Sequence, residues 1–185
     1  MTTQLVKQLT GTPIVWADAT DWPGGGAHGF GDDDYQLDLT ALATTKARQG
    51  TKGDLGALRA AEWSITVGVE LAVAPAAGVC VYYYWSPSAS GTAGTGNAGG
   101  ASGADGAYQD SSEAEWLNQL IYLGCLVATA DATAVVQIQT IGRFRPPQRY
   151  GMPVVYNVTA QAFHSDAVEM FFALTPIDDQ IQGAV

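Results

Sequence analysis

Three neighbouring residues in the C-terminal part of the chain carry side chains that are used in nucleophilic catalysis: His164, Ser165 and Asp166. The members of a catalytic triad come from distant points of a fold, because adjacent side chains cannot converge on one reacting atom. Serine and aspartate are also frequent in turns. We therefore predict a turn between two strands here. An esterase or glycosidase has no other motif in its favour, and we expect a protein that is not an enzyme.

The glycines Gly94, Gly96 and Gly99 match the G-x-G-x-x-G pattern of dinucleotide-binding loops. That pattern binds a pyrophosphate only where the glycines join a strand to a helix whose N-terminus faces the phosphates. Here more Gly, Ala and Ser follow, no helical pattern begins, and no lysine follows the glycines as it does in a Walker A loop. We expect no nucleotide and no other cofactor.

Candidate metal ligands are few and their spacing is unfavourable. The two histidines and two cysteines show no zinc-binding spacing. The triplet Asp32, Asp33 and Asp34 lacks the ligand order of an EF-hand loop, so a solvated acidic loop is favoured over a Ca²⁺ site. Cys80 and Cys125 lie in apolar runs, where free cysteine behaves as a small hydrophobe. We expect no metal site and two buried, reduced thiols.

Charged residues are scarce in this chain. Its 185 residues fit one domain, and only 14% of them are charged, against roughly 25% in an average soluble domain. The balance of 18 acidic and 8 basic residues gives a formal net charge of -10. Binding to a phosphate backbone needs clustered Lys and Arg, so we expect no nucleic-acid partner. No apolar stretch reaches the roughly 18 residues of a membrane span, and no signal-peptide core is visible, so we expect no membrane partner and no export.

The few basic residues fall mostly into two short windows. Between residues 60 and 142 there is no Lys or Arg, and three arginines then follow within seven residues. Arginine forms bidentate pairs with carboxylates and is enriched at interfaces. Two interpretations remain open: pairing with a partner, or pairing with the excess carboxylates of the same chain. For the first, the predicted interface residues are Arg143, Phe144, Arg145, Arg149, Tyr150 and Trp22.

Alternating apolar residues predict a β-protein. In 62–71 every second residue is apolar, the pattern of a strand with one face on a core. The run 78–85 is apolar on both faces and is predicted to be a central strand. Further strands are predicted at 12–17, 35–40, 123–129, 134–144, 150–158 and 168–174. Short strands separated by turns predict a single domain over 1–185, an all-β antiparallel β-sandwich with jelly-roll topology.

One short helix is expected, at about 113–122. Ser112 and Glu115 fit a capping box, and apolar residues follow at helical spacing. Gly124 is the predicted stop.

Two segments show neither a strand nor a helix pattern. Residues 88–107 form a long loop rich in Gly, Ala and Ser, a composition typical of a flexible linker. Residues 1–30 are expected to include an extended N-terminal arm. We expect contacts with neighbouring subunits to hold the Gly-rich loop and both ends of the chain.

Three runs of the sequence resemble a family of small virion proteins of tailed bacteriophages. They are IGRFRPPQRYGMPVVYNVTAQAFHSDAVEMFFALTPI at 141–177, GTGNAGGASGADGAY at 94–108 and LGCLVATADATAVVQ at 123–137. The resemblance does not extend to the N-terminal third. It implies a jelly-roll-like sandwich that decorates or cements the capsid, seated on the major capsid protein and often trimeric. It implies no catalytic residues, and it places the protein on the outer surface of the virion after synthesis in the host cytoplasm.

Two functions follow from the residues and the resemblance. The first is a non-enzymatic decoration or cement protein that binds the major capsid protein lattice and copies of itself. The alternative is a carbohydrate-binding or host-attachment module of the virion, on a head fibre or tail, since jelly rolls also serve as lectins. For that alternative, the predicted stacking platform comprises Trp16, Trp22, Tyr82 and Tyr84.

Overall fold

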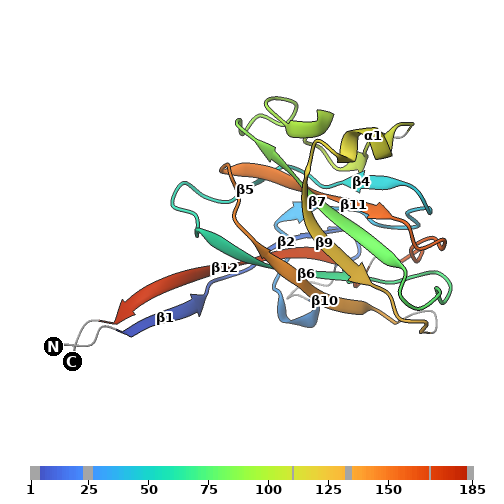
Figure 1. The fold of residues 1–185 in the computed structure, drawn as a ribbon, viewed down its shortest axis with the longest axis horizontal. Helices are drawn as coiled ribbons and strands as arrows, with labels where there is room; N and C mark the ends of the chain where they lie inside the picture. Colours follow the sequence, from blue (N-terminus) through green and yellow to red (C-terminus); the bar gives the residue numbers. More distant parts are fainter. Residues whose placement is uncertain (1–4, 23–26, 110, 132–134, 167, 183–185) are drawn as a thin grey trace.

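Two six-stranded sheets face each other in the computed structural model of the chain, which describes residues 5–22, 27–109, 111–131, 135–166 and 168–182 (Figure 1). The first sheet contains β1 (Leu5–Thr10), β2 (Ile14–Ala17), β3 (Tyr35–Gln36), β6 (Glu62–Val69), β10 (Gln137–Phe144) and β12 (Phe171–Gln182). The second sheet contains β4 (Ala47–Gln49), β5 (Gly53–Asp54), β7 (Cys80–Ser88), β8 (Gly106–Ala107), β9 (Ile121–Val127) and β11 (Tyr150–Asn157). The helical segments are η1 (Ala27–Gly29), η2 (Ala98–Gly100) and α1 (Glu113–Leu117).

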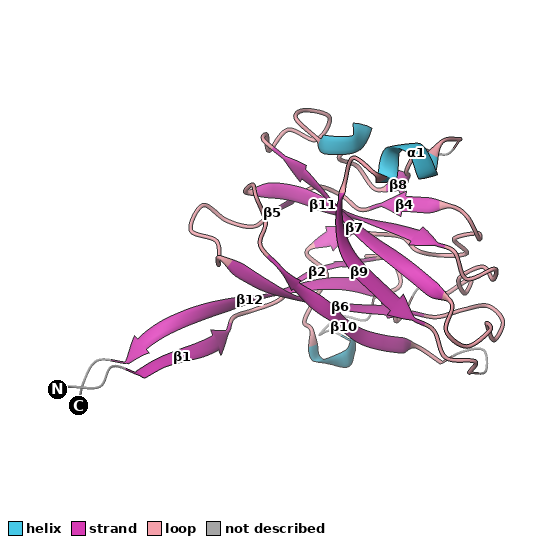
Figure 2. Ribbon diagram, in the orientation of Figure 1, coloured by secondary structure: helices cyan, strands magenta, loops and turns pink. Residues whose placement is uncertain are grey.

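The strands of the first sheet lie in the order β10–β6–β12–β2–β3, with β1 also paired to β12. Those of the second sheet lie in the order β8–β4–β11–β7–β9, with β5 also paired to β11. The pairing of β2 with β3 is parallel, and the other named strands pair antiparallel. The predicted all-β, sandwich-like architecture with one short helix is confirmed (Figure 2). The jelly-roll topology stays a prediction.

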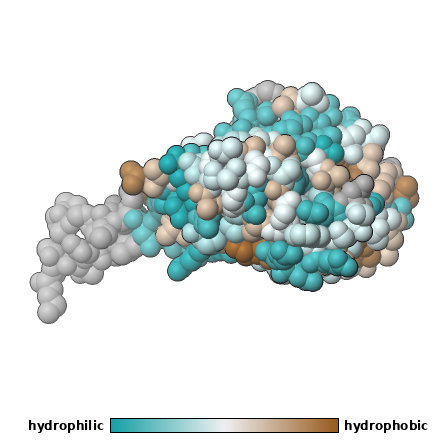
Figure 3. All heavy atoms as spheres, turned by 90° about the horizontal axis from the view of Figure 1, so that it is seen from above, coloured by the Kyte–Doolittle hydropathy of each residue, from teal (hydrophilic) through white to brown (hydrophobic). Residues whose placement is uncertain are grey.

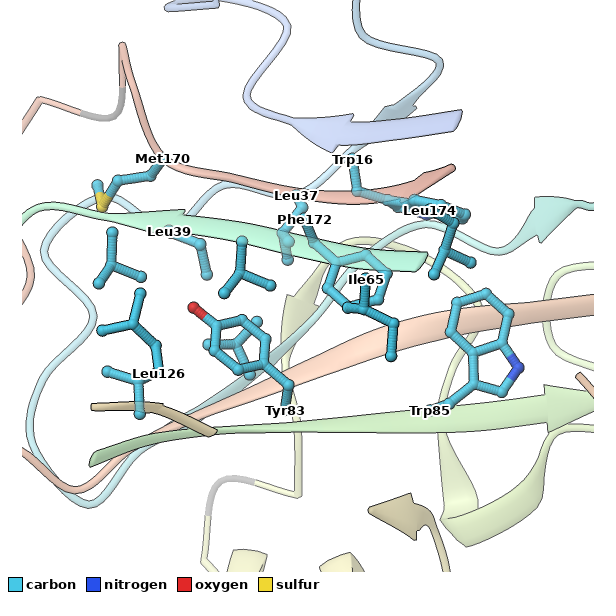
Figure 4. Close-up of a cluster of buried hydrophobic side chains, with 14 of the residues drawn as sticks. Trp16, Leu37, Leu39, Ile65, Tyr83, Trp85, Leu126, Met170, Phe172 and Leu174 are labelled. Carbon is cyan, nitrogen blue, oxygen red and sulfur yellow. The ribbon is translucent and has the colours of Figure 1, made fainter. Parts of the chain in front are cut away.

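Alternation along the long strands fills the space between the sheets. The apolar residues of β6 that the sequence pattern assigns to the core are all buried there: Trp63, Ile65, Val67 and Val69. From β12 of the same sheet, Phe172 also points into this space, and Tyr83 and Trp85 of β7 point toward it from the second sheet (Figure 4). This shared core explains why the two sheets lie face to face.

Aromatic rings make up the centre of that core. The Phe172 ring centroid lies 5.8 Å from that of Trp16, 6.2 Å from that of Tyr83 and 6.3 Å from that of Trp85. Trp16 is also fixed by its indole N–H, which donates to the Thr51 carbonyl oxygen at 2.8 Å. The rings therefore connect β2 and β12 of the first sheet with β7 of the second.

Parts of the chain also cover the outer faces of both sheets. Over the first sheet, Trp22 and Phe30 pack on Phe171, with ring centroids 5.5 and 4.9 Å away. Over the second sheet, the Gly-rich loop and α1 build a further apolar cluster with β4 and β11, made of Ala47, Ala101, Tyr108, Leu117, Leu120, Met152 and Val154. Two segments that look like loops in the sequence thus bury apolar surface of their own.

The helix is shorter than predicted. α1 ends at Leu117 rather than near residue 122, and the Ser112 side chain makes no capping hydrogen bond. Ile121 instead begins β9 opposite Trp85, and Gly124 lies inside that strand rather than at a helix end. A helix this short is marginal on its own, so pairing with β7 outweighs the helical spacing of the apolar residues.

Several strand boundaries also differ from the predictions. The strand predicted at 35–40 is reduced to Tyr35–Gln36, and β12 begins at Phe171 and continues far past residue 174. The run 78–85, predicted to be a central strand, contributes most of β7, which is an interior strand paired with β11 on one side and β9 on the other. Its outward-facing residues Cys80, Tyr82 and Tyr84 are only half-buried.

We predict that Phe172→Ala lowers the free energy of unfolding by about 3–5 kcal/mol, because it removes a buried ring and leaves a cavity between the sheets. Urea unfolding followed by tryptophan fluorescence measures the loss. Tyr83→Phe is the control in the same core, since the Tyr83 hydroxyl is buried without a hydrogen-bond partner in the described chain. Removing that hydroxyl is expected to leave the stability unchanged or raised by about 1 kcal/mol. Similar losses for both variants would contradict this account of the core.

Candidate interaction surfaces

The two terminal strands leave the sandwich together as a two-stranded ribbon (Figure 1). β12 pairs with β6 as far as Ile177, and beyond that residue the described chain pairs it only with β1. The ribbon runs from the pair Thr10–Ile177 to the pair Leu5–Gln182. Within the described residues, both of its outer edges therefore carry unpaired backbone groups. Of the predicted arm over 1–30, this ribbon contains Leu5–Thr10, whereas Ile14–Ala17 belongs to the sandwich.

The edges of the sandwich itself are shortened or covered. The edge strands β3 and β8 are each two residues long. At the opposite edges of the two sheets, side chains of β10 form hydrogen bonds with the backbone at the end of β9. Gln139 accepts from the Val127 N–H at 3.0 Å. Gln137 accepts from the Thr129 N–H and donates to the Thr129 carbonyl oxygen. Such protection prevents the addition of further strands. Among the described residues the ribbon strands are neither shortened nor capped in this way, and only the charges of Lys7, Asp178 and Asp179 limit the addition of a strand.

The first two predicted interface arginines lie at the base of the ribbon. Arg143 and Arg145 place nitrogen atoms 3.2 and 3.7 Å from carboxylate oxygens of Glu62, which pairs with Ile177 in the sheet. The Arg145 side chain is 79% exposed, so its pairing with Glu62 contributes little to stability. Phe144, between the two arginines, is buried in the core between the sheets.

The third arginine, Arg149, forms a bidentate pair with Asp54. Its Nε and Nη2 atoms donate to the two carboxylate oxygens at 2.7 and 2.5 Å, and its guanidinium lies 5.0 Å from the centroid of the Tyr150 ring. The hydrogen bonds from Arg149 lower the pKa of Asp54. A carboxyl group with a lowered pKa stabilises the fold above its ordinary pKa, and this contribution is lost as the pH falls through the folded-state value.

The described structure pairs basic residues with carboxylates of the same chain, which was one of the two open interpretations. Further pairs of this kind join Lys46 to Glu113, and Arg48 to both Asp38 and Asp105. Trp22 and Phe144 are buried by their own chain and offer no surface to a partner in this conformation. For the remaining predicted interface residues, a role in an interface stays a prediction: Arg143, Arg145, Arg149 and Tyr150.

The Gly-rich loop is held by its own chain. Lys52 is buried, with 8% of the residue exposed. Its ammonium group donates to three backbone carbonyl oxygens of the loop, those of Ser90, Thr92 and Thr95, at 3.0, 2.6 and 2.9 Å. The Tyr108 hydroxyl donates to the Gly99 carbonyl at 2.6 Å. The loop is therefore ordered by contacts within its own chain and needs no neighbouring subunit to hold it, because a carbonyl oxygen accepts a hydrogen bond from a buried cation beside those it accepts within the loop. Contacts of the loop and of the chain ends with neighbouring subunits stay a prediction.

The outer face of the second sheet is covered at one end only, by the Gly-rich loop and α1. Toward the other end, Tyr122 is 54% exposed, and its ring centroid lies 6.1 Å from that of Tyr82 and 5.4 Å from that of Tyr84. Seen from the side of α1, most of the molecular surface is hydrophilic or neutral, and apolar residues form small separate groups (Figure 3). Tyr82, Tyr84 and Tyr122 form a local aromatic surface on this part of the sheet.

This aromatic surface contains half of the predicted stacking platform. Tyr82 and Tyr84 lie on it, whereas Trp16 and Trp22 are buried, so the platform as predicted from the sequence is wrong. Tyr122 takes part instead, because an irregularity between β7 and β9 places it opposite Tyr84. No sequence signal indicates that register, and Tyr122 was missed for this reason.

Both cysteines lie on the same outer face. Cys80 and Cys125 are free and half-buried rather than buried, because the described chain leaves this end of the sheet uncovered. The expectation of buried thiols is therefore wrong.

The other chemical candidates form ordinary turns. The Asp166 N–H donates to His164 Nδ1 at 3.2 Å, in a turn as predicted. The glycines of the G-x-G-x-x-G match lead into the three-residue η2 and not into a longer helix. No group of three or more His, Cys, Asp or Glu side chains that could hold a metal ion occurs in the described residues. Nor does any helix in the described part of the chain have the length and apolar character needed to cross a membrane.

Comparison with known proteins identified no relative: no family model, no curated protein and no solved structure matches this chain.

We predict that Lys52→Met releases the Gly-rich loop without unfolding the sandwich. Three carbonyl oxygens lose a charged donor, which is expected to cost about 1.5–3 kcal/mol and to speed amide hydrogen exchange across residues 88–107. Arg59→Met is the matched control, since it removes one positive charge seven residues further along the chain, within the same basic stretch 46–59. Equal exchange rates in the two variants would show that Lys52 does not hold the loop.

Proposed function

We propose that this chain is a non-enzymatic virion protein of a tailed bacteriophage that decorates or cements the capsid by binding the lattice of the major capsid protein. The observation that carries the proposal is the two-stranded ribbon of both terminal strands, which extends beyond the sandwich and, within the part of the chain that the structure describes, has unpaired outer edges (Figure 1). The resemblance of the runs 94–108, 123–137 and 141–177 to virion proteins supplies the setting.

The ribbon favours an assembly function for a physical reason. An isolated two-stranded ribbon is only marginally stable in water, because it buries little apolar surface. Lys7, Gln8, Leu9 and Thr10 are all exposed along it. A strand of a neighbouring protein can pair with a free edge through backbone hydrogen bonds, and this adds both stability and affinity. The capsid shell and further copies of this chain are the partners that we propose.

The composition of the surface supports the same function. Most of the few cations are already paired with carboxylates or carbonyls of their own chain, so little positive charge remains for binding nucleic acid. A protein that binds the assembled shell and not the free subunits stabilises the shell by the difference in affinity. Such a mechanism requires no catalytic group.

The proposal predicts that the ribbon is required for binding to heads. A variant that lacks residues 1–10 and 178–185 is expected to bind heads stripped of the native protein with an affinity at least tenfold lower than that of the full chain. The reason is that strand pairing through the ribbon supplies the contact. Sedimentation of heads with added protein measures binding, and heat resistance of DNA-filled heads measures cementing. Cooperative thermal unfolding of the variant shows that the sandwich remains folded.

The variant Val73→Ser is the comparison for this test, because it changes an exposed residue beyond the end of β6 that lies away from the ribbon, and it leaves both the ribbon and the predicted interface arginines intact. Binding of the truncated protein at the full-length level would contradict the proposal. Heads that bind the protein but show unchanged heat resistance would exclude cementing and leave decoration alone.

The exposed tyrosine surface favours one alternative, a carbohydrate-binding or host-attachment module of the virion. Aromatic rings offer apolar faces with a polar hydroxyl at the edge, which suits the mixed surface of a sugar. This alternative predicts that the soluble protein binds specific glycans on an array and that Tyr122→Ala abolishes the signal, with Ile138→Ala on the neighbouring edge strand as control. Absence of binding to any glycan would remove the alternative.

A further inference from the structure

Cys80 and Cys125 lie diagonally opposite each other on neighbouring strands. In the β7–β9 pair, Cys80 lies opposite Val127, and Cys125 lies opposite Tyr82. Successive residues of a strand alternate between its faces, so both thiols project from the outer face of the second sheet. Diagonal neighbours of this kind are about 7–8 Å apart at their Cα atoms, and their side chains can still meet.

The two thiols interact with each other and with a neighbouring phenol. Burial raises the pKa of Cys80, and a hydrogen bond with Cys125 raises it further. Burial and a hydrogen bond with Cys125 also raise the pKa of Tyr122 to about 12. Tyr122 and Val127 beside the thiols are 54% and 47% exposed, so a small ion can reach this part of the surface.

The diagonal arrangement is unfavourable for a disulfide. A disulfide needs Cα atoms within about 7 Å and sulfur atoms about 2.05 Å apart, and wider pairs need movement of the backbone. Here β7 is fixed between β9 and β11 by pairing on both sides. A bridging atom between the sulfurs relieves this constraint, because two metal–sulfur bonds of about 2.3 Å each span a wider gap.

We propose that Cys80 and Cys125 form a two-coordinate site for a soft d¹⁰ metal ion, with monovalent copper as the representative ion. Soft thiolate ligands select such ions. Two S–H bonds lose their protons to solvent and two sulfur–metal bonds form, with no change in oxidation state. Zn²⁺ prefers four ligands, and the described residues offer no further His, Cys, Asp or Glu group here.

The side chains around the two thiols are mainly aromatic. The titratable side chains on the same sheet face are phenols: Tyr82 and Tyr84 on β7, Tyr122 on β9, and Tyr156 on β11, opposite Tyr82. Thiols release their protons when they bind a metal ion, so the affinity of this site is expected to rise with pH.

Anaerobic titration of the full chain with Cu⁺, in competition with a chromogenic Cu⁺ chelator, tests the proposal. We expect one ion per chain, a thiolate-to-copper absorption band in the near ultraviolet, and an affinity that rises with pH. Cys80→Ser and Cys125→Ser are each expected to lower the affinity at least tenfold, while thermal unfolding shows that the variants fold. Retention of copper by either single variant at the level of the native chain would overturn the proposal, as would equally tight retention of Zn²⁺.

A rearranged variant separates the diagonal geometry from the mere presence of two thiols. Cys125→Ser/Val127→Cys places the second thiol directly opposite Cys80. Directly opposite residues are within disulfide distance. With oxidised glutathione as the oxidant, two protein thiols are oxidised to one disulfide while glutathione disulfide is reduced to two thiols. This variant is expected to close its disulfide at least tenfold faster than the native chain. Equal rates would show that the native pair is a disulfide site and not a metal site.

Discussion

Burial of the aromatic cluster around Phe172 is the interaction on which the rest of the structure depends. The ring lies within 6.3 Å of the rings of Trp16, Tyr83 and Trp85, centroid to centroid, so one side chain joins both sheets. Apolar burial is the largest favourable contribution to folding, and it acts here where the two sheets share one core. Because the core positions each sheet relative to the other, it also determines which faces and edges remain for partners.

The small number of charges follows from how this chain uses them. Lys52 is buried and satisfies three carbonyl oxygens of the Gly-rich loop, and Arg48 joins Asp38 to Asp105. These cations therefore bind segments outside the strands, the Gly-rich loop and the residues Asp38 and Asp105, to the region of β4. A loop whose composition is typical of a flexible linker is thereby ordered within a single chain. Low charge content alone therefore does not show that partners cover the surface of this protein.

Free strand edges distinguish the ribbon from the sandwich. The sandwich shortens its edges at β3 and β8 and caps the end of β9 with Gln137 and Gln139, whereas the terminal strands project with both edges unpaired among the described residues. Edge protection lowers the tendency to add strands, and this difference is the reason why we propose the ribbon for pairing with another chain. The outer face of the second sheet is a separate surface, with tyrosines and a pair of thiols instead of free backbone.

Local patterns were sufficient to predict the sandwich, because alternation in β6 assigns Trp63, Ile65, Val67 and Val69 to one face whatever the neighbouring strands are. They were insufficient for the polar and short strands, such as β4 with the sequence Ala-Arg-Gln, which form only because β11 and β8 offer pairing partners. The same holds for the candidate sites. Trp22 and Phe144 looked available in the sequence and are buried, while Tyr122 joins Tyr84 and Cys125 joins Cys80 only through the register of β9 on β7. Register and burial are properties of two segments together, so no property of either segment alone determines them.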